Sequence, residues 1–286
     1  MKKQLGIRIV LTLLVVFVLF LVFSLPKYFS AKTDLFTAID NRDYTAISKI
    51  ITQYPSLVNS NRVTIGFFAR ITDCSSNTPL LEACRSSDLD MVKLLVENGA
   101  DIDKGSNVVP AYPIISALTA HPSVAHEMSW YLIENGADLT VSSSFYTVPW
   151  AIVSKPVSDD DEDDMIAAVD LLRFVVENGA PLTPPDKNFY GIDCLLGYAS
   201  RNNHSLVCQY LLDNDFFDVN DVVDEYGATA LIVAAKAPNE TFGACKVLLE
   251  NGADKTLKDN FGKTAYDYSV ENGHARLRDL LEDSKM

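Results

Sequence analysis

The sequence predicts an all-α repeat solenoid, built from many copies of one short helix pair. The first observation is the phrase Glu-Asn-Gly-Ala-Asp, which occurs at residues 97–101, 134–138 and 250–254 and returns in altered form at 177–181 and 213–216. An aliphatic run precedes each copy, as in Val92-Lys93-Leu94-Leu95-Val96. The phrase's central positions are 99, 136, 179, 215 and 252, so the steps between them are 37, 43, 36 and 37 residues. A near-constant step of this size indicates one repeated structural unit.

Each phrase has the chemistry of a helix end. An apolar helical face that stops at Asn-Gly predicts a helix C-terminus, because glycine enters the left-handed conformation without a Cβ penalty. We therefore expect a helix to end before Gly99 and before each equivalent glycine. Asp215 is the exception, since it takes the place of the glycine in the degenerate copy.

Composition excludes some classes of function. The chain has 286 residues, of which 48% are hydrophobic, enough for a core that continues along an array of repeats. Its net charge of −14 argues against nucleic-acid binding, which needs a basic surface, and would favour a basic protein partner. We expect no small-molecule substrate.

The cysteines and histidines show no metal-binding pattern. The five cysteines and four histidines include no pair at zinc-ligand spacing, so the sequence predicts no metal site and no cofactor. We interpret the cysteines, which are Cys74, Cys84, Cys194, Cys208 and Cys245, as small core residues. A disulfide between Cys74 and Cys84 is the alternative if the domain meets an oxidising compartment.

The N-terminus predicts a membrane anchor. Residues 9–25 form a run of 17 residues without a charge, preceded by Lys2, Lys3 and Arg8 and ended by Pro26 and Lys27. As a helix the run would be ~26 Å long, close to the roughly 30 Å of a bilayer core. We predict a transmembrane signal anchor over 9–25, with a cleaved signal peptide as the alternative.

The charges around this run set the expected topology. Positive residues ahead of the span keep residues 1–8, a short basic tail, in the cytoplasm. Residues 26–32 are then a linker, and the rest of the chain is extracytoplasmic. In a bacterium this describes a single-pass protein of the inner membrane whose repeat domain lies in the periplasm.

The first repeats show how a unit is built. Residues 33–59 have the pattern of two short amphipathic helices, and residues 60–77 are expected to form an extended loop or hairpin. The next unit opens with Thr78, a good N-cap, and Pro79, which suits the first helical position. A second helix is expected from Leu89 to Asn98.

At this unit the motifs resemble a known family. Thr78-Pro79-Leu80 followed by Ala83, then Val92 with Leu94-Leu95, then Asn98-Gly99-Ala100-Asp101, is similar to the ankyrin repeat, whose unit is about 33 residues. The resemblance covers residues 33–286 in about seven units, several of them degenerate, with the first and last as caps. It implies that each unit is a helix pair with a projecting β-turn or hairpin. It also implies that His204 and His274 are structural residues of the turns between paired helices.

The longest insertion carries an acidic run. Residues 158–164 read Ser-Asp-Asp-Asp-Glu-Asp-Asp and fall between the two helices of the fourth unit. The run lacks the glycine and the terminal glutamate of a calcium-binding loop. It could bind a cation or a basic partner. Alternatively, it is a solvated loop whose acidic end stabilises the N-terminus of the following helix.

No catalytic motif was found, so we predict that the protein is not an enzyme. In ankyrin arrays the partner usually meets the hairpin tips, and here the tips are rich in aromatic residues, which often anchor interfaces. For Tyr190, Tyr226 and Phe261 a structural role is the alternative, because each precedes a glycine where the repeat tolerates an aromatic. For Phe67, Phe68, Phe145, Tyr146 and Trp150, which lie in segments outside the consensus, packing is an equally open alternative to binding. The candidate partner-binding residues are Phe67, Phe68, Tyr112, Phe145, Tyr146, Trp150, Asp159, Asp160, Asp161, Phe189, Tyr190 and Tyr226.

These expectations define a function. The sequence predicts a non-catalytic protein-interaction module, tethered to the membrane and binding a protein partner on the extracytoplasmic side. A narrower hypothesis is an immunity or inhibitor protein that neutralises a toxic effector. The alternative is a structural accessory or scaffold that supports an envelope enzyme or complex.

Overall fold

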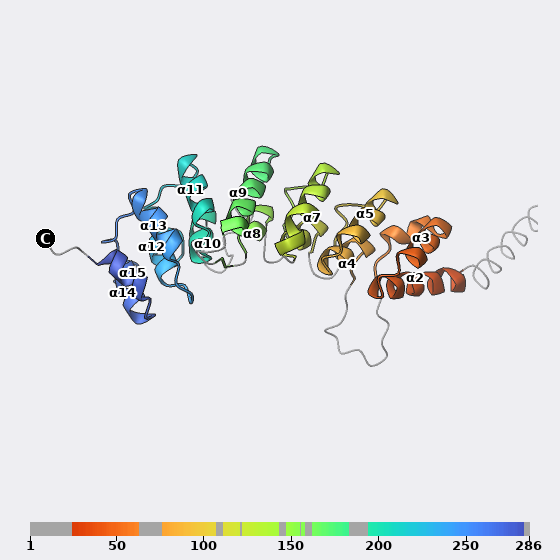
Figure 1. The fold of residues 1–286 in the computed structure, drawn as a ribbon, viewed down its shortest axis with the longest axis horizontal. Helices are drawn as coiled ribbons and strands as arrows, with labels where there is room; N and C mark the ends of the chain where they lie inside the picture. Colours follow the sequence, from red (N-terminus) through yellow and green to blue (C-terminus); the bar gives the residue numbers. More distant parts are fainter. Residues whose placement is uncertain are drawn as a thin grey trace, which may run out of the picture. The chain divides into compact units, whose positions relative to one another are not determined.

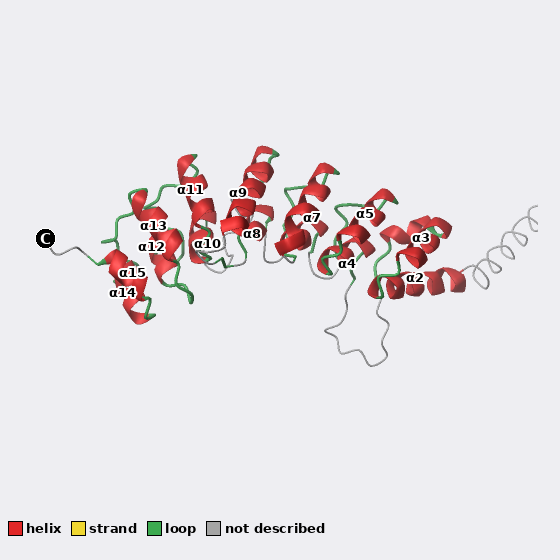
Figure 2. Cartoon of the chain, viewed as in Figure 1, coloured by secondary structure: helices red, strands yellow, loops and turns green. Residues whose placement is uncertain are grey.

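The computed structural model describes residues 25–62, 76–106, 111–120, 122–142, 147–154, 156–157, 162–182 and 194–282, and helices dominate them (Figures 1 and 2). Except for Leu25, the expected transmembrane segment lies outside these residues. Among the helices that are described, none combines the length and the apolar character needed to cross a membrane. The anchor therefore stays a prediction from the sequence.

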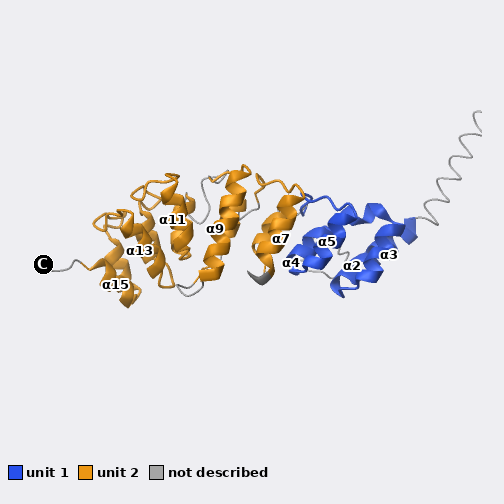
Figure 3. Ribbon diagram, turned by 45° about the horizontal axis from the view of Figure 1, so that its top comes forward, with its two compact units in different colours: residues 1–108 blue, residues 109–286 orange. Residues whose placement is uncertain are grey.

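The chain divides into two compact units, residues 1–108 and 109–286 (Figure 3). In the first unit, the helices are α2 (Leu25–Asp40), α3 (Tyr44–Gln53), the short 3-10 helix η2 (Pro55–Asn59), α4 (Pro79–Arg85) and α5 (Leu89–Glu97). α2 already includes residues 26–32, which we expected to be a linker. The segment is helical, and its residue Ala31 is buried with Leu35, because one face of α2 packs on α3.

The second unit continues the same architecture with ten further helices in its described part. They are α6 (Pro113–Leu118), α7 (Pro122–Glu134), α8 (Val148–Ile152), α9 (Glu162–Glu177), α10 (Leu195–Arg201), α11 (Ser205–Asp213), α12 (Ala230–Ala235), α13 (Phe242–Glu250), α14 (Ala265–Glu271) and α15 (Ala275–Leu281). With α2 to α5 they form seven pairs. The prediction of an all-α fold is confirmed, and where hairpins were expected the described residues show only two isolated bridges, Ser142–Thr147 and Val222–Thr229.

The first helix of a pair begins at a threonine cap where the sequence predicted one. The Thr78 hydroxyl accepts a hydrogen bond from the Leu81 backbone N–H, and Pro79 occupies the first turn, where no N–H is needed. Thr229 caps α12 in the same way. Thr264 adds a reciprocal bond, because Asp267 accepts from its backbone N–H and completes a capping box.

The second helix ends as the recurring phrase predicted. Gly99, Gly136, Gly179 and Gly252 have φ angles of 85°, 92°, 93° and 88°, and Asp215 follows them into the left-handed region at 54°. In each copy the next residue bonds back to the helix, for example from Ala100 N–H to the Leu95 carbonyl at 3.0 Å. This six-to-one bond identifies a Schellman motif, which satisfies carbonyl groups that the helix end would otherwise leave open.

Asparagine side chains join successive repeats. Asn59 donates to the Gly99 carbonyl at 3.0 Å and accepts from the Asp101 N–H at 2.6 Å. Asn220 repeats this in the second unit, with 3.2 Å to Gly252 and 2.8 Å to Asp254. The recurring phrase therefore serves two purposes: it ends its own helix, and it presents one carbonyl and one N–H to the preceding repeat. We call this pair of bonds the asparagine bracket.

The cysteines and turn histidines mostly occupy the places expected for them. Cys84, Cys208 and Cys245 are fully buried and are not in disulfides, and burial raises the pKa of Cys208 to about 12. Cys194 is half-buried, and Cys74 lies outside the described residues. His204 and His274 are buried at the N-cap positions of α11 and α15. In α3 and α5 the same position is occupied by Asp43 and Asp88.

The helix-end conformation can be tested with opposite substitutions at equivalent positions. Gly99→Ala should destabilise the protein by about 1 kcal/mol, because a Cβ is disfavoured at positive φ although nothing lies within 4 Å of its place. Asp215→Gly should be neutral or stabilising, because it relieves a non-glycine residue from the same region. The measurement is the urea midpoint followed by circular dichroism. Equal losses for both variants would contradict the assignment.

The asparagine bracket predicts a second difference. Asn220→Ala should lower the free energy of unfolding by about 1 kcal/mol, because it removes two hydrogen bonds between repeats. The matched control is Asn214→Ala, whose side chain donates only to the Tyr210 carbonyl within its own repeat. Urea unfolding of both variants should place Asn220→Ala at the lower midpoint. A control that lost as much stability would show that the inter-repeat bonds contribute little.

Candidate protein-binding surface

Two neighbouring turns of the second unit are built alike. At residues 224–229 and 259–264 the sequence follows the pattern Asp, any residue, aromatic, Gly, any residue, Thr. The Asp224 carboxylate accepts from the N–H groups of Tyr226 at 3.0 Å and of Ala228 at 2.8 Å. The Asp259 carboxylate accepts from Phe261 at 2.9 Å and from Lys263 at 3.0 Å. An aspartate that binds its own turn in this way fixes the backbone without a β-ladder.

The two turns also contact each other. The Asn260 N–H donates to the Tyr226 carbonyl at 2.8 Å. Gly227 has a φ of 76°, and a Cβ added there would meet the Asn260 side chain at 2.6 Å. The second turn thus packs closely against the first, and any other residue at position 227 would have to displace the Asn260 side chain and adopt a positive φ.

Each turn leaves its aromatic side chain in solvent. Tyr226 is 43% exposed and Phe261 is 62% exposed. Their ring centroids are 5.9 Å apart with an angle of 31° between the planes. Adjacent exposed aromatic side chains form a contiguous apolar patch, and such patches often mark a site of contact with another molecule. Single exposed apolar residues are common on protein surfaces and carry no such implication.

The ammonium group of one lysine lies near both exposed rings. The Lys236 ammonium group, just after α12, lies 5.1 Å from the Tyr226 ring centroid, 5.8 Å from that of Phe261 and 5.5 Å from that of Tyr268. Each contact falls within the range of cation–π attraction. We call Tyr226, Lys236, Phe261 and Tyr268 the fingertip cluster.

Asp259 connects the cluster to the core of the last repeats. The buried Tyr268 hydroxyl donates to its carboxylate at 2.6 Å. Burial by itself raises the pKa of Asp259, but the hydrogen bonds from Tyr268 and from two backbone N–H groups outweigh it, so the net pKa is lowered. The Tyr268 pKa is raised, by burial and by the same carboxylate. Asp259 therefore stays ionised at neutral pH and keeps the turn in one conformation.

The candidate partner-binding residues predicted from the sequence differ in their exposure to solvent. Tyr226 is exposed in the fingertip cluster, and Tyr112 is half-buried at the N-cap of α6. Trp150 is a correction, because it is 1% exposed and its ring packs 4.9 Å from that of Tyr198, which removes it from any binding surface. The other candidates lie outside the described residues: Phe67, Phe68, Phe145, Tyr146, Asp159, Asp160, Asp161, Phe189 and Tyr190.

Sequence reasoning missed part of this cluster. Lys236 and Tyr268 lie on other elements than the two turns, and no local pattern connects them to Tyr226. The available signal was the shared turn pattern of residues 224–229 and 259–264, which would have paired Tyr226 with Phe261.

The end of the acidic run, Glu162 to Asp164, forms the exposed first turn of α9, where negative charge favours the helix N-terminus. Among the described residues no group of three histidine, cysteine, aspartate or glutamate residues is arranged to hold a metal ion.

Comparison with protein families identifies the repeat. A family model described as "Ankyrin repeats (3 copies)" matches residues 165–259 and 196–285, and the single-copy model "Ankyrin repeat" matches residues 75–107. Together these matches cover more than half of the chain.

Curated proteins show the same relationship. The chain is 28% identical over 247 residues to the Caenorhabditis elegans "Ankyrin repeat and KH domain-containing protein mask-1", and 22% identical over 257 residues to a "Putative ankyrin repeat protein" of Rickettsia felis. Each match takes in 80% of this chain, but the chain spans only 9% and 61% of the length of these two relatives.

Solved structures agree in fold. The human ASB11 ankyrin repeat domain has a TM-score of 0.61 at 21% identity, covering 88% of this chain and 99% of that one. A structure of the Bd0816 predatory endopeptidase from Bdellovibrio bacteriovorus in complex with immunity protein Bd3460 has a TM-score of 0.53 at 22% identity, covering 72% and 98%. EF0377, an ankyrin repeat protein, has a TM-score of 0.52 at 25% identity, covering 71% and 96%.

The family matches, the recurrent helix pairs and the Schellman motifs at their ends all indicate ankyrin repeats. The ankyrin fold is generally a non-enzymatic scaffold for protein–protein interaction, and in the fingertip cluster this chain has an exposed surface suited to that role. The chain belongs to the ankyrin-repeat family.

Proposed function

We propose that this protein is a non-catalytic, membrane-tethered module that binds a partner protein on the extracytoplasmic side of the membrane, with the fingertip cluster at the centre of the interface. The observation that carries the proposal is the exposed pair of Tyr226 and Phe261, held 5.9 Å apart. Interfaces draw most of their binding energy from a few such aromatic residues.

The cluster is ordered before a partner arrives. Asp224 and Asp259 fix the backbone of the two turns, and Lys236 lies within cation–π reach of both exposed rings. A side chain that is already held in place loses little conformational freedom on binding, so more of its contact energy appears as affinity. This rigidity distinguishes the pair from aromatic residues that are merely exposed.

Charge favours a basic partner. The chain has a net charge of −14, and Glu225, next to Tyr226, is exposed. Negative potential around an apolar centre accelerates the approach of a positively charged protein and disfavours acidic ones.

The membrane tether and the location rest on the N-terminal sequence. The uncharged run at 9–25, with Lys2, Lys3 and Arg8 before it, has the length and charge asymmetry of a signal anchor. Such an anchor would leave the repeats outside the cytoplasm.

Within this function we favour an immunity or inhibitor role against a toxic effector. Support comes from the similar structure in which an immunity protein is complexed with a predatory endopeptidase. The acidic surface and the expected extracytoplasmic location fit the same role, because a secreted toxic enzyme would be met there. A gene for a secreted effector beside this one would strengthen the assignment.

The location predicts a protease-protection result. When the outer membrane is permeabilised and the inner membrane is left intact, added protease should degrade the repeat domain and leave a cytoplasmic marker protein whole. The measurement is an immunoblot against the C-terminal repeats. Degradation only after the inner membrane is broken would place the domain in the cytoplasm and contradict the topology.

The interface predicts a loss of binding from single substitutions. Tyr226→Ala and Phe261→Ala should each weaken binding of the affinity-captured partner by about 30-fold, as expected for central aromatic anchors. The dissociation constant of the repurified partner, measured by calorimetry, gives the answer.

A matched control separates the cluster from exposed aromatics in general. Phe216→Ala removes a ring that is 38% exposed just after α11 and should change affinity less than twofold. If the partner bound Tyr226→Ala and Phe261→Ala as tightly as the unaltered protein, the proposed surface would be wrong.

A further inference from the structure

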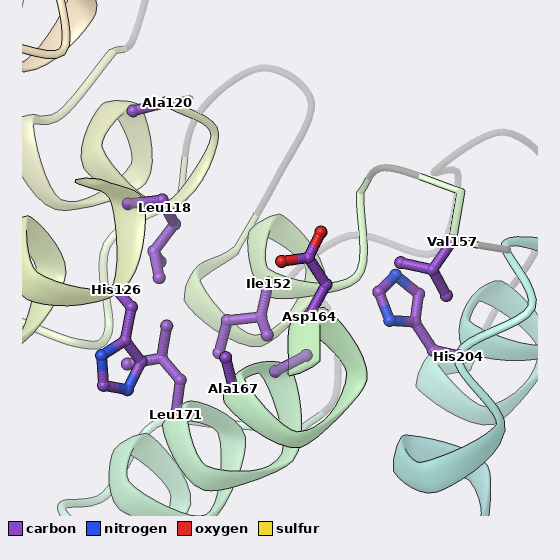
Figure 4. A pocket seen from close by; sticks show the side chains of 11 residues that line it. Leu118, Ala120, His126, Ile152, Val157, Asp164, Ala167, Leu171 and His204 are labelled. Carbon is purple, nitrogen blue, oxygen red and sulfur yellow. The ribbon is translucent and has the colours of Figure 1, made fainter. Parts of the chain in front are cut away.

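A pocket lies in the second unit, among the helices of the third to fifth pairs. It is lined by eleven residues, among them Leu118 at the end of α6, His126 of α7, Ile152 of α8, Asp164 and Leu171 of α9, and His204 at the start of α11. Figure 4 shows that the labelled side chains come from several helices, with His126 and His204 on opposite sides. We call it the α9 pocket.

The pocket forms because α9 is longer than its counterparts. α9 has 16 residues, whereas α11 and α13, the second helices of the next two pairs, have nine each. The additional N-terminal turns come from the insertion that contains the acidic run. They bring Asp164, Ala167 and Ala168 to the pocket wall.

The size of the pocket selects the kind of occupant. Its volume is about 100 Å³. Sites for cofactors and drug-sized ligands are roughly 300–1,000 Å³, whereas a cavity of about 150 Å³ already takes a benzene molecule. The α9 pocket therefore suits one side chain of leucine size and is too small for a cofactor.

The chemistry of the lining narrows the occupant further. Eight of its eleven residues are alanine, valine, leucine or isoleucine, so the interior favours an apolar group. Asp164 is an exposed carboxylate of the lining, and the exposed residues Glu162 and Asp163 precede it in the first turn of α9. A residue beside the apolar anchor would thus face negative charge.

We infer that the α9 pocket is a docking site for a protein segment in which an apolar side chain of leucine size is flanked by lysine or arginine. The leucine fills the space between Leu118, Ile152 and Leu171, and the adjacent basic residue pairs with Asp164 at the edge. An apolar anchor in a pocket with a charged rim is a common arrangement of binding hot spots. The site is separate from the fingertip cluster and does not depend on it.

The test uses the full-length protein with methyl groups labelled for NMR, and a defined probe peptide, acetyl-Gly-Lys-Leu-Lys-Gly-amide. The methyl signals of Ile152 and Leu171 should shift on titration, which reports occupancy at the pocket itself. Peptides with serine in place of leucine, or with glutamate in place of both lysines, should bind at least about tenfold more weakly, because each loses one of the two complementary features.

Variants of the protein locate the contacts. Ala167→Leu should abolish the shifts by filling the pocket while circular dichroism stays unchanged, and if that variant fails to fold, Asp164→Asn supplies the test. Asp164→Asn should weaken the lysine-containing peptide about two- to fivefold, the range of a partly exposed ion pair. The matched control is Asp163→Asn, which changes the same charge in the same helical turn outside the lining and should change affinity less than twofold.

The outcome can be separated from that of the fingertip proposal. Phe261→Ala should leave the peptide titration unchanged, although it is expected to weaken the captured partner. The inference is overturned if the serine and leucine peptides bind equally, or if Asp163→Asn weakens binding as much as Asp164→Asn. Unchanged peptide binding to a folded Ala167→Leu variant would also overturn it.

Discussion

The structure depends on the left-handed turn that ends the second helix of each pair. Most of the described helices have five to ten residues and are too short to be stable alone, so their apolar faces must be buried by packing between helices. This requires that the chain leave every second helix in the same direction. The Schellman turn at Gly99 and its equivalents provides that direction, and the asparagine brackets at Asn59 and Asn220 attach the turn to the preceding repeat.

The two proposed binding sites lie where this regular scaffold exposes side chains that packing does not use or where an insertion interrupts it. The turns at Asp224 and Asp259 are regular, but their aromatic side chains are exposed and not used in core packing. The Lys236 ammonium group lies near both rings. The α9 pocket has the opposite origin, since an insertion lengthens one helix and leaves a space lined by small residues. Both features belong to a chain with a net charge of −14, which is why basic partners are proposed for each.

Local chemistry could be predicted from the sequence because it depends on residues close together in the chain. The cap at Thr78, the helix stop at Gly99 and the role of Asp215 as a glycine substitute are all set by bonds that span six residues or fewer. For Trp150 the sequence left binding and packing open, and the structure decides for packing. This residue lies in a segment that departs from the repeat pattern, and its burial against Tyr198 is a contact between residues 48 positions apart, which no local pattern reports.

The sequence by itself determined the repeat, its period, the ends of its helices and the acidic character of the surface. Only the tertiary structure decided which aromatic residues meet, because Tyr226, Lys236, Phe261 and Tyr268 come from two repeats and converge only after those repeats pack. It likewise decided that Leu118, Ile152 and His204 enclose one pocket. The physical reason is that helix caps are satisfied within a few residues, whereas a binding surface is made by side chains whose separation along the chain is one repeat or more.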